Sequence, residues 1–354
     1  MKNRKMMLLE IVVVLCLLFL DALPVIAAEQ EMQKVRASEV KASEDFVLGI
    51  YGNANEDDTI DMRDVTYIKL VIFGKKPETE LCDANYDGRI SMLDVVQTKL
   101  IIVGKEGEIT IKDDVNRTVT VELPVKRIVT IAGSYGPEAL CALGVQDRIV
   151  GVTSYAKEHA EHLKSFLKDI PDVGSSKSPD VEKILALEPD IVHAYACYYP
   201  YEVLEDALDA ASIPLVILDF HKPKTFANAI QTFGYMLNKR ERADELLEFE
   251  QEHIGIIEER VRDIPEEKRV RVYFMLYPYY YGVTKTIGTS YPRHDDIELC
   301  GGINIFEDRD LRTFEVDPEE VALRNPDVMI ATTHAGASRA PLGYGIIDIA
   351  PVEE

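Results

Sequence analysis

The longest stretch with helical periodicity is residues 224–264. Its apolar side chains are mostly three or four positions apart, the spacing of an amphipathic helix, at Phe226, Ile230, Phe233, Leu237, Leu246, Leu247, Ile254, Ile257, Val261 and Ile264. We expect a short break at Asn238 and Lys239, and an end at Pro265. The part after the break would be about 30 Å long, at a rise of about 1.5 Å per residue. A helix of that length either bridges two lobes or crosses over within one sheet.

Stretches typical of buried strands alternate with amphipathic stretches on both sides of this helix. The expected strands are residues 126–133, 148–152, 189–194, 213–218, 269–276 and 327–333. The expected helices are residues 137–144, 181–187, 202–211 and 295–300, and a hairpin at 109–111 and 118–121 precedes them all. Strands that alternate with helices predict a mainly α/β fold, with a mostly parallel sheet covered on both faces.

An internal repeat of 12 residues, with its two copies 30 residues apart, lies ahead of the α/β region. Side chains that carry oxygen or an amide occupy positions one, three, five, nine and twelve of each copy: Asn53, Asn55, Asp57, Asp61 and Asp64, then Asp83, Asn85, Asp87, Ser91 and Asp94. This spacing directs oxygens inward from one tight loop, and a hard cation such as calcium takes roughly six to eight oxygen ligands. The repeat therefore predicts two calcium sites, with one ion in each.

The two copies differ in ways that predict unequal sites. Gly88 supplies a positive φ at position six of the second copy, whereas Asp58 would adopt it in the first copy at a cost of about 1 kcal/mol. The first copy also has Asn53 at position one, so we expect it to bind its ion more weakly. Ile60 and Ile90, at position eight, would pair the two loops through a short β-contact. An apolar helix follows each loop, and the segment before each loop is too short for a full helix.

Two units of loop followed by helix resemble a dockerin, the calcium-folded module that binds cohesin domains. The resemblance covers residues 48–105 and implies a small α-helical module at 46–106. In dockerins, the residues that face cohesin come just after position nine and a turn or two later, which implies Met62, Arg63, Lys69, Leu70, Met92, Leu93, Lys99 and Leu100 here. The family often has small hydroxyl residues directly after position nine. The Met-Arg and Met-Leu pairs depart from that pattern, so the type of cohesin partner stays open.

Composition and the amino end indicate a cellular setting and exclude one class of function. The formal net charge is −23, which argues against nucleic-acid binding because that needs a basic face. A charged start, an apolar run at 11–20 and small residues at 27–28 follow the order of a secretory signal. We expect a signal peptide at 1–28 and a flexible spacer at 29–45, and hence a secreted or cell-envelope protein. The alternative is a signal that is retained as an anchor.

A second resemblance spans residues 109–333. It rests on Asp114-Val-Asn-Arg117, Lys126-Arg-Ile-Val-Thr130, Pro137-Glu-Ala-Leu140, Val181-Glu-Lys-Ile-Leu-Ala-Leu-Glu-Pro-Asp190, Glu298-Leu-Cys-Gly-Gly-Ile-Asn304 and Asn325-Pro-Asp327. In this order and spacing the motifs resemble the ABC-transporter solute-binding proteins for ferric siderophores, haem and cobalamin. The resemblance implies two α/β lobes within 107–354, at 107–222 and 266–354, bridged by the long helix. The family's last strand and helix have no clear counterpart after Thr333, so the second lobe is trimmed or the chain is a fragment.

Aromatic and polar side chains follow several predicted strands, at the edge where open α/β sheets bind ligands. The candidate ligand-binding residues are Tyr135, Tyr195, Tyr198, Tyr199, His221, Tyr279, Arg293 and His294. Aromatic faces suit a large planar or chelated ligand, and hydroxyl, imidazole and guanidinium groups suit its polar edge. Each aromatic could instead pack within its lobe, although the resemblance favours ligand contact for Tyr195. It also implies that Glu202 and Glu298 dock an ABC permease.

Catalytic motifs are missing from the sequence, since Gly133-Ser-Tyr-Gly136 lacks the spacing of a nucleophile elbow. We expect a non-enzyme: the extracellular solute-binding component of an ABC importer for an iron-siderophore, haem or corrinoid, tethered through a calcium-dependent dockerin–cohesin interaction. Its partners would be a cohesin-domain protein, an ABC permease and a metal-chelate small molecule. The alternative is a scaffold-docked structural or adhesive cell-surface protein whose binding-protein fold no longer transports a ligand. A third hypothesis is an enzyme on the chelatase-like relative of this fold.

Overall fold

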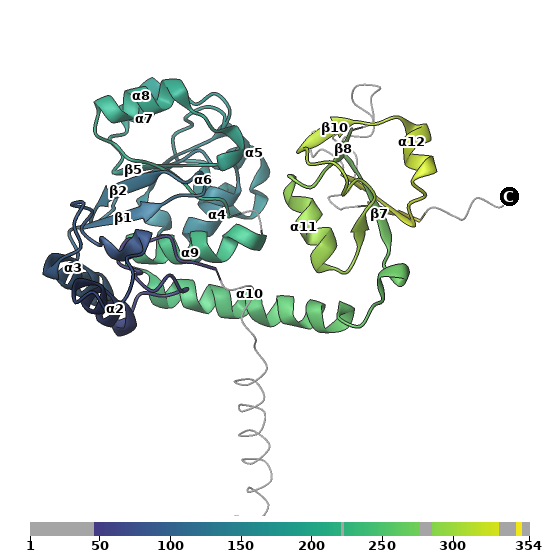
Figure 1. Cartoon of the computed structure of the whole chain (residues 1–354). Helices are drawn as coiled ribbons and strands as arrows, with labels where there is room; N and C mark the ends of the chain where they lie inside the picture. The colour runs from purple at the N-terminus through teal and green to yellow at the C-terminus, as the bar shows by residue number, and fades with distance from the viewer. Residues whose placement is uncertain (1–45, 221–222, 277–284, 333–344, 349–354) are drawn as a thin grey trace, which may run out of the picture. The chain divides into compact units, whose positions relative to one another are not determined.

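The computed structural model describes residues 46–220, 223–276, 285–332 and 345–348, all within one compact unit of the chain. The predicted signal peptide at 1–28 and spacer at 29–45 lie outside these residues, as do the candidate ligand-binding residues His221 and Tyr279. Of the helices that are described, none is both long and apolar enough to cross a membrane. Figure 1 shows how the elements are arranged.

Each predicted calcium loop leads directly into a helix, α2 (Met62–Ile72) or α3 (Met92–Val103). The side chain of Asp61 caps α2 and that of Ser91 caps α3, and the carboxylate at position twelve of each loop accepts from the amide of the cap residue. These capping boxes satisfy amides that have no partner within the first helical turn. The segment before the second loop forms a single 3-10 turn, η1 (Glu80–Cys82), in agreement with the prediction that it is too short for a full helix.

The predicted hairpin is present as strands β1 (Glu108–Lys112) and β2 (Thr118–Glu122), which pair antiparallel. Ile109, Thr110 and Ile111 of β1 are all buried, so both faces of this strand are covered in its middle. Ile50, just ahead of the first calcium loop, forms an antiparallel bridge with Ile111. The segment ahead of the first predicted calcium loop therefore lies beside β1 and extends the pairing of this hairpin.

Four parallel strands form the sheet of the first lobe, and all four coincide with predicted strands. They lie in the order β4 (Ile149–Val152), β3 (Ile128–Thr130), β5 (Ile191–Ala194) and β6 (Leu215–Ile217). Parallel neighbours require a crossover between them, and the helices of this lobe supply it. The expectation of a parallel sheet is confirmed for this lobe.

Both faces of this sheet are covered, because successive side chains of a strand point to opposite faces. Ile128 and its neighbours in the sheet pack on one face with α4 (Tyr135–Ala142) and α9 (Pro223–Met236). Val129 and its neighbours pack on the other face with α7 (Val181–Ala186) and α8 (Glu202–Ala210). Figure 1 shows α7 and α8 on one side of the sheet and α4 and α9 on the other. Two short helices of this lobe, without a clear periodicity in the sequence, are α5 (Ser154–His159) and α6 (Lys164–Leu167).

The long amphipathic stretch forms two helices, α9 and α10 (Arg240–Val261), so the predicted break is confirmed. Asn238 lies between them with a φ of 55°, a left-handed conformation that commonly follows the end of a helix. Leu247 of α10 lies in the core of the first lobe. At the other end, a Cβ added to Gly301 of the second lobe would lie 2.8 Å from Cβ of Val261. Helix α10 therefore contacts both lobes, which is the bridging arrangement.

The second lobe has a mixed sheet rather than a mostly parallel one. Its strands lie in the order β10 (Thr313–Glu315), β8 (Lys285–Ile287), β7 (Arg271–Leu276), β11 (Val328–Thr332) and β12 (Gly345–Asp348), with β9 (Ile303–Asn304) also beside β7. Strand β7 is parallel to β9 and β11 but antiparallel to β8, and β12 is antiparallel to β11. The part of the chain after Thr333, where we expected no counterpart of a last strand, thus supplies β12.

Helices α11 (Pro292–Leu299) and α12 (Pro318–Leu323) complete the described part of the second lobe. Each begins with a proline, which suits the first helical position because its missing N–H has no partner there in any case. Short 3-10 turns also occur at Gln146–Arg148, Glu161–Leu163, Ala196–Tyr198 and Glu266–Lys268.

Candidate functional site

The second of the two predicted calcium loops is held in shape by its own carboxylates. Asp83 accepts hydrogen bonds from the amides of Asp87 (3.1 Å) and Gly88 (2.8 Å). At the other end of the loop, Asp94 accepts from the amides of Asn85 (3.3 Å) and Ser91 (2.6 Å). Gly88 has a φ of 83°, so the positive-φ turn predicted at position six is present. The carboxylates at positions one and twelve therefore organise the loop backbone.

The first loop shares the contacts at position twelve and departs from the second loop at position one. Asp64 accepts from the amide of Asn55 (3.1 Å), as its counterpart does in the second loop. Asn53 is fully buried, and its Nδ2 donates to the carbonyl oxygens of Leu48 (2.8 Å) and Asp57 (2.6 Å). An amide in place of a carboxylate thus holds the loop by donating hydrogen bonds instead of accepting them.

Two details of the first loop differ from what its sequence predicts. Asp58 at position six has no positive φ and so does not carry the strain that we expected there; a positive φ lies at position four of both loops, at Glu56 (56°) and Tyr86 (53°). The amide of Ile60 donates to the hydroxyl of Tyr235 on α9 (3.1 Å) instead of pairing with the equivalent residue of the second loop. The contact between Ile60 and Tyr235 follows from the packing of this loop against the first lobe, which the repeat itself does not encode.

Some acidic side chains of the loops lie beside a guanidinium group, and others are buried. The guanidinium of Arg63 lies 3.0 Å from the carboxylate of Asp57 and 2.8 Å from that of Asp61. Burial raises the pKa of Asp64 to about 6 and also raises the pKa of Asp94, while hydrogen bonds from loop amides act in the opposite direction. The charged forms of these two buried carboxyls are therefore costly unless a cation lies beside them.

The donor set of each loop fits calcium when its amide oxygens are included. Among the residues that the structure describes, no three His, Cys, Asp or Glu side chains gather closely enough to hold a metal ion. However, Oδ1 of Asn53 and Oδ1 of Asn85 are buried and have no hydrogen-bond partner. A buried acceptor without a partner costs about 1–3 kcal/mol. A hard cation in each loop would satisfy the amide oxygen of that loop, because amide oxygens are among the preferred ligands of such a cation.

The residues implied to face cohesin lie on the solvent-facing side of α2 and α3. Val65 and Ile68 of α2 and Val95 of α3 form the buried side of these helices. Of the implied residues, three are half-buried, Lys69, Leu70 and Leu100, and five are exposed, Met62, Arg63, Met92, Leu93 and Lys99.

Three candidate ligand-binding tyrosines gather at the carboxyl ends of β3 and β5. The rings of Tyr135 and Tyr195 meet edge to face with centroids 6.4 Å apart, and the ring of Tyr198 lies 6.5 Å from that of Tyr195. Tyr135 begins α4 shortly after β3, and Tyr195 follows β5 directly. Gly133 permits this close approach, since it has a φ of 52° and an added Cβ would lie 3.1 Å from the hydroxyl oxygen of Tyr195.

Tyr195 is only 7% exposed and is held by two residues that the sequence did not indicate. The hydroxyl of Tyr201 donates to its carbonyl oxygen (3.0 Å), and Asp219 accepts from the next amide, that of Ala196 (3.0 Å). Burial raises the pKa of the Tyr195 hydroxyl far above its usual value, so the group is a neutral donor. Asp219 follows β6, and the strand-end rule that selected His221 would also have found it.

Arg293 connects the second lobe to this tyrosine cluster. It lies in the first turn of α11, and its Nη2 donates to the hydroxyl of Tyr135 (3.1 Å). Its Nη1 lies 2.5 Å from the carboxylate of Asp296, one turn further along the same helix. The structure thus brings together candidate residues that are far apart in the sequence and come from both lobes.

The remaining described candidates make other contacts. His294 is buried, its Nε2 lies 3.3 Å from the carboxylate of Glu298, and its Nδ1 lies 3.4 Å from Nδ2 of Asn304. Both ring nitrogens therefore have partners within the second lobe. The ring of Tyr199 lies under the guanidinium of Arg117, with 5.4 Å between the carbon of the guanidinium and the ring centroid.

Comparison with known proteins identifies the family of the α/β region. A family model described as periplasmic binding protein matches residues 128–343, a range that begins after both predicted calcium loops. The vitamin B12-binding protein of Yersinia pestis (strain Pestoides F) is 27% identical over 208 residues, which cover 58% of this chain and 69% of that protein. The periplasmic haem-binding protein RhuT from Roseiflexus sp. RS-1 is 26% identical with a TM-score of 0.50, and the match covers 59% of this chain and 76% of RhuT.

The periplasmic vitamin B12-binding protein BtuF of Vibrio cholerae shares the fold, with 21% identity and a TM-score of 0.51 over 61% of this chain and 79% of BtuF. Because the family model matches more than half of the residues of this chain, the chain belongs to the periplasmic binding protein family.

Proposed function

We propose that this chain is the solute-binding component of an ABC importer and that its ligand is a metal chelate, namely an iron-siderophore, haem or a corrinoid. Membership of a family of substrate-binding proteins supports the importer role and a non-enzymatic function outside the cytoplasm. Relatives named for vitamin B12 and for haem support the class of ligand. The predicted signal peptide at 1–28 would direct export.

The observation that carries this proposal is the meeting of aromatic rings and a guanidinium group at one place. Tyr135 and Tyr195 lie together at strand ends of the first lobe, and Arg293 of the second lobe reaches the hydroxyl of Tyr135. Aromatic rings bind planar ligand surfaces, and a guanidinium pairs with carboxylate groups at a ligand's edge. The neutral Tyr195 hydroxyl adds a hydrogen-bond donor. This combination suits a bulky chelate with acidic substituents.

Absorption spectra of the purified protein give the first test, because a co-purified haem, corrinoid or ferric chelate absorbs visible light. Ligand-free protein is then titrated with a member of each class. Tyrosine fluorescence reports binding, since the chain has no Trp. We expect micromolar or tighter affinity for one class and much weaker affinity for the same ligand scaffold without its metal. No response to any class would favour the structural or adhesive alternative.

We also propose that the two loops bind two calcium ions. The unpartnered amide oxygens of Asn53 and Asn85 and the buried carboxyls of both loops support this. The second loop should bind more tightly, because Asp83 brings a charge to position one where the first loop has a neutral amide.

Calorimetric titration of the metal-free full chain tests the calcium proposal and should show two steps. Asp87→Ala should remove the tighter step, because this variant lacks a carboxylate of the second loop. Asp58→Ala is the matched control, since Asp58 is exposed at position six, which contributes no ligand side chain. A parent protein without calcium heat, or two unchanged steps in Asp87→Ala, would contradict the proposal.

The solvent-facing side of α2 and α3 is our proposed docking surface for a cohesin-domain protein. Its apolar members Met62, Met92 and Leu93 are each more than half exposed. Exposed apolar side chains on one face commonly mark a site of protein–protein interaction. Met92→Glu should therefore abolish calcium-dependent binding to purified cohesin domains. Val203→Glu, at an exposed apolar position of α8, should leave it intact. Failure of every cohesin domain to bind the parent protein would refute the tethering role.

We assign permease docking to Glu202 and Glu298, one on each lobe. Glu202 is exposed at the first position of α8, and the side chain of Glu298 is half exposed near the end of α11. Both carboxylates reach solvent, and accessible carboxylates attract basic groups of a partner, which fits the docking role that the family resemblance implies.

A further inference from the structure

The two-loop module, defined as residues 48–105, and the first lobe share one hydrophobic core. Leu48, Ile50, Ile60 and Ile101 of the module are each at most 4% exposed. They belong to the same buried cluster as these residues of the hairpin and α9 region: Ile109, Ile111, Phe233, Tyr235, Met236 and Leu237. A module joined only by a tether would bury its apolar residues within itself. This module has a small core of its own and in addition contributes four residues to the core of the lobe.

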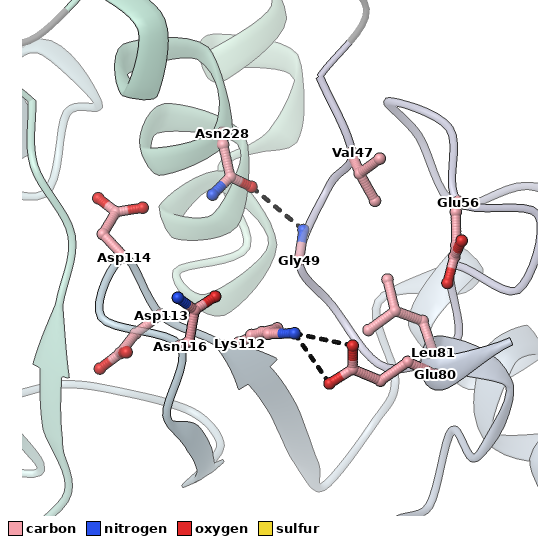
Figure 2. Close-up of a pocket in the computed structure, with 10 residues that line it drawn as sticks. All are labelled: Val47, Gly49, Glu56, Glu80, Leu81, Lys112, Asp113, Asp114, Asn116 and Asn228. Atoms are coloured by element: carbon pink, nitrogen blue, oxygen red, sulfur yellow. Dashed lines mark hydrogen bonds and ion pairs between the residues drawn. The ribbon is translucent and has the colours of Figure 1, made fainter.

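Polar contacts fasten the chain ahead of the first loop to the lobe. The amide of Gly49 donates to Oδ1 of Asn228 on α9 (3.1 Å), and its carbonyl oxygen accepts from the amide of Lys112 (2.7 Å). The ammonium group of Lys112 pairs with the carboxylate of Glu80 (2.7 Å). Figure 2 shows the first and last of these contacts around a hollow of about 430 Å³ at the junction. The module is thus held by α9 and by the hairpin.

The first calcium loop fixes two residues of the shared core directly. The amide of Ile60 donates to the buried hydroxyl of Tyr235 (3.1 Å). The amide of Leu48 donates to the carbonyl oxygen of Asp57 (3.0 Å), and its carbonyl oxygen accepts from Asn53 (2.8 Å). The positions of Leu48 and Ile60 therefore depend on the order of this loop.

A second connection joins the end of α3 to the start of α10. The guanidinium of Arg240, the first residue of α10, donates to the carbonyl oxygens of Ile102 (2.9 Å) and Ile101. Carbonyls at the end of a helix have no partner within the helix and attract a positive charge. The same guanidinium lies 4.3 Å over the ring of Tyr235. Figure 1 shows α2 and α3 beside the start of α10.

We propose that the module is a calcium-dependent clamp on the first lobe, so that an ion in the first loop stabilises α9 and the start of α10. The inference rests on the calcium binding proposed above. Without an ion, the carboxylates of the loop repel one another, and a loosened loop releases Leu48 and Ile60 from the core. Tyr235 and Arg240 then lose their partners. Because such coupling is reciprocal, contacts that hold α9 also tighten calcium binding.

Hydrogen exchange of the full chain, read by mass spectrometry in calcium and in chelator, tests the clamp. On removal of calcium, amides of α9 and of the first turns of α10 should exchange at least about fivefold faster, together with those of the loops. Amides of β7 and β11 in the second lobe should be unchanged, and they serve as the internal reference.

Tyr235→Phe tests the direct link, because it removes the hydroxyl that accepts from Ile60 and keeps the ring under Arg240. Calcium affinity of the weaker calorimetric step should fall about two- to tenfold, the range expected for one buried hydrogen bond. Tyr201→Phe is the matched control. It removes a buried hydroxyl from the same lobe, bonded to the carbonyl of Tyr195, and should leave both calcium steps unchanged.

The outcomes separate the clamp from the calcium sites. If the loops gain protection with calcium while α9 and α10 do not, and Tyr235→Phe keeps both calcium steps, the clamp is refuted and the calcium sites stand. If the parent protein binds no calcium, the proposed sites fail and the clamp fails with them. If Tyr235→Phe does not fold, exchange of the parent protein alone decides between these outcomes.

Discussion

Acid should destabilise the first lobe through one buried imidazole, that of His193 on β5. Its Nε2 lies 2.9 Å from the carbonyl oxygen of Leu218, which can only accept, so Nε2 carries the proton and Nδ1 accepts from the hydroxyl of Thr130 (3.0 Å). The rings of Phe220 and Phe233 lie against it, with centroids 5.2 and 5.1 Å away. Burial lowers the pKa of His193 to about 4. The folded protein therefore holds this ring neutral.

The size of the effect follows from the two pKa values. Histidine in the unfolded chain has a pKa of about 6.5, so His193 of the unfolded chain becomes protonated below that pH. In the folded chain the same ring becomes protonated only near pH 4. The stability contributed by the neutral ring is complete above pH 6.5 and is lost as the pH falls. One pKa unit corresponds to about 1.4 kcal/mol, which gives a loss of about 2 kcal/mol at pH 5 and about 3 kcal/mol at pH 4.

Urea unfolding followed by circular dichroism at pH 7.5 and pH 5 measures this loss. Carboxyl groups titrate as well, so the parent is compared with His193→Gln, whose side chain keeps a donor and an acceptor but does not titrate. The parent should lose about 2 kcal/mol more than the variant over this interval. Equal losses would refute the reasoning. If the variant is too unstable, a histidine NMR titration of the parent decides, because this ring must stay neutral at pH 5.

Glu250→Gln should raise the melting temperature at pH 8 but not at pH 4. Burial raises the pKa of Glu250 to about 7, so the folded state loses stability as the pH rises towards that value and the carboxyl ionises. Equal shifts of the melting temperature at both pH values would contradict this. Ile60→Ala should lower the free energy of unfolding by about 2–4 kcal/mol, since the side chain is 4% exposed in the shared core. Calorimetry that shows a loss below about 1 kcal/mol would mean that this core is not formed. Charge reversal at Glu202 and Glu298 together should abolish association with the permease while ligand binding survives, and unchanged association would remove both residues from the docking surface.

Long periodic stretches were predictable because each carries its own signal. The strands of the first sheet are continuous apolar runs between turn residues, and the two helices around Asn238 show three- and four-residue spacing. Strands β8, β9 and β10 have only two or three residues, too few to show a period of two. Strands β8 and β9 pair with β7, and β10 pairs with β8, so their formation depends on contacts between distant segments.

The candidate sites show the same distinction between features with a local sequence signal and features that depend on distant contacts. Tyr135 and Tyr195 were predictable because each follows a strand, and ligand sites of open α/β sheets lie at strand ends. The partners that bury His294, and the hydrogen bond between Ile60 and Tyr235, were not predictable. The latter two residues are 175 positions apart, and a contact over that distance leaves no local pattern in the sequence. The repeat predicts the loops but not the face that they turn towards the lobe.

Binding of a metal chelate against Tyr195 is tested most directly by one titration. Parent protein, Tyr195→Ala and Tyr155→Ala are each titrated with a ferric siderophore, haem and a corrinoid. Tyr155 is an exposed tyrosine on α5, so its loss is the matched control. We expect one ligand class to bind the parent and the control equally, and Tyr195→Ala at least about tenfold more weakly, as for a buried aromatic anchor. Equal affinity of all three proteins, or no binding by the parent, would contradict the account.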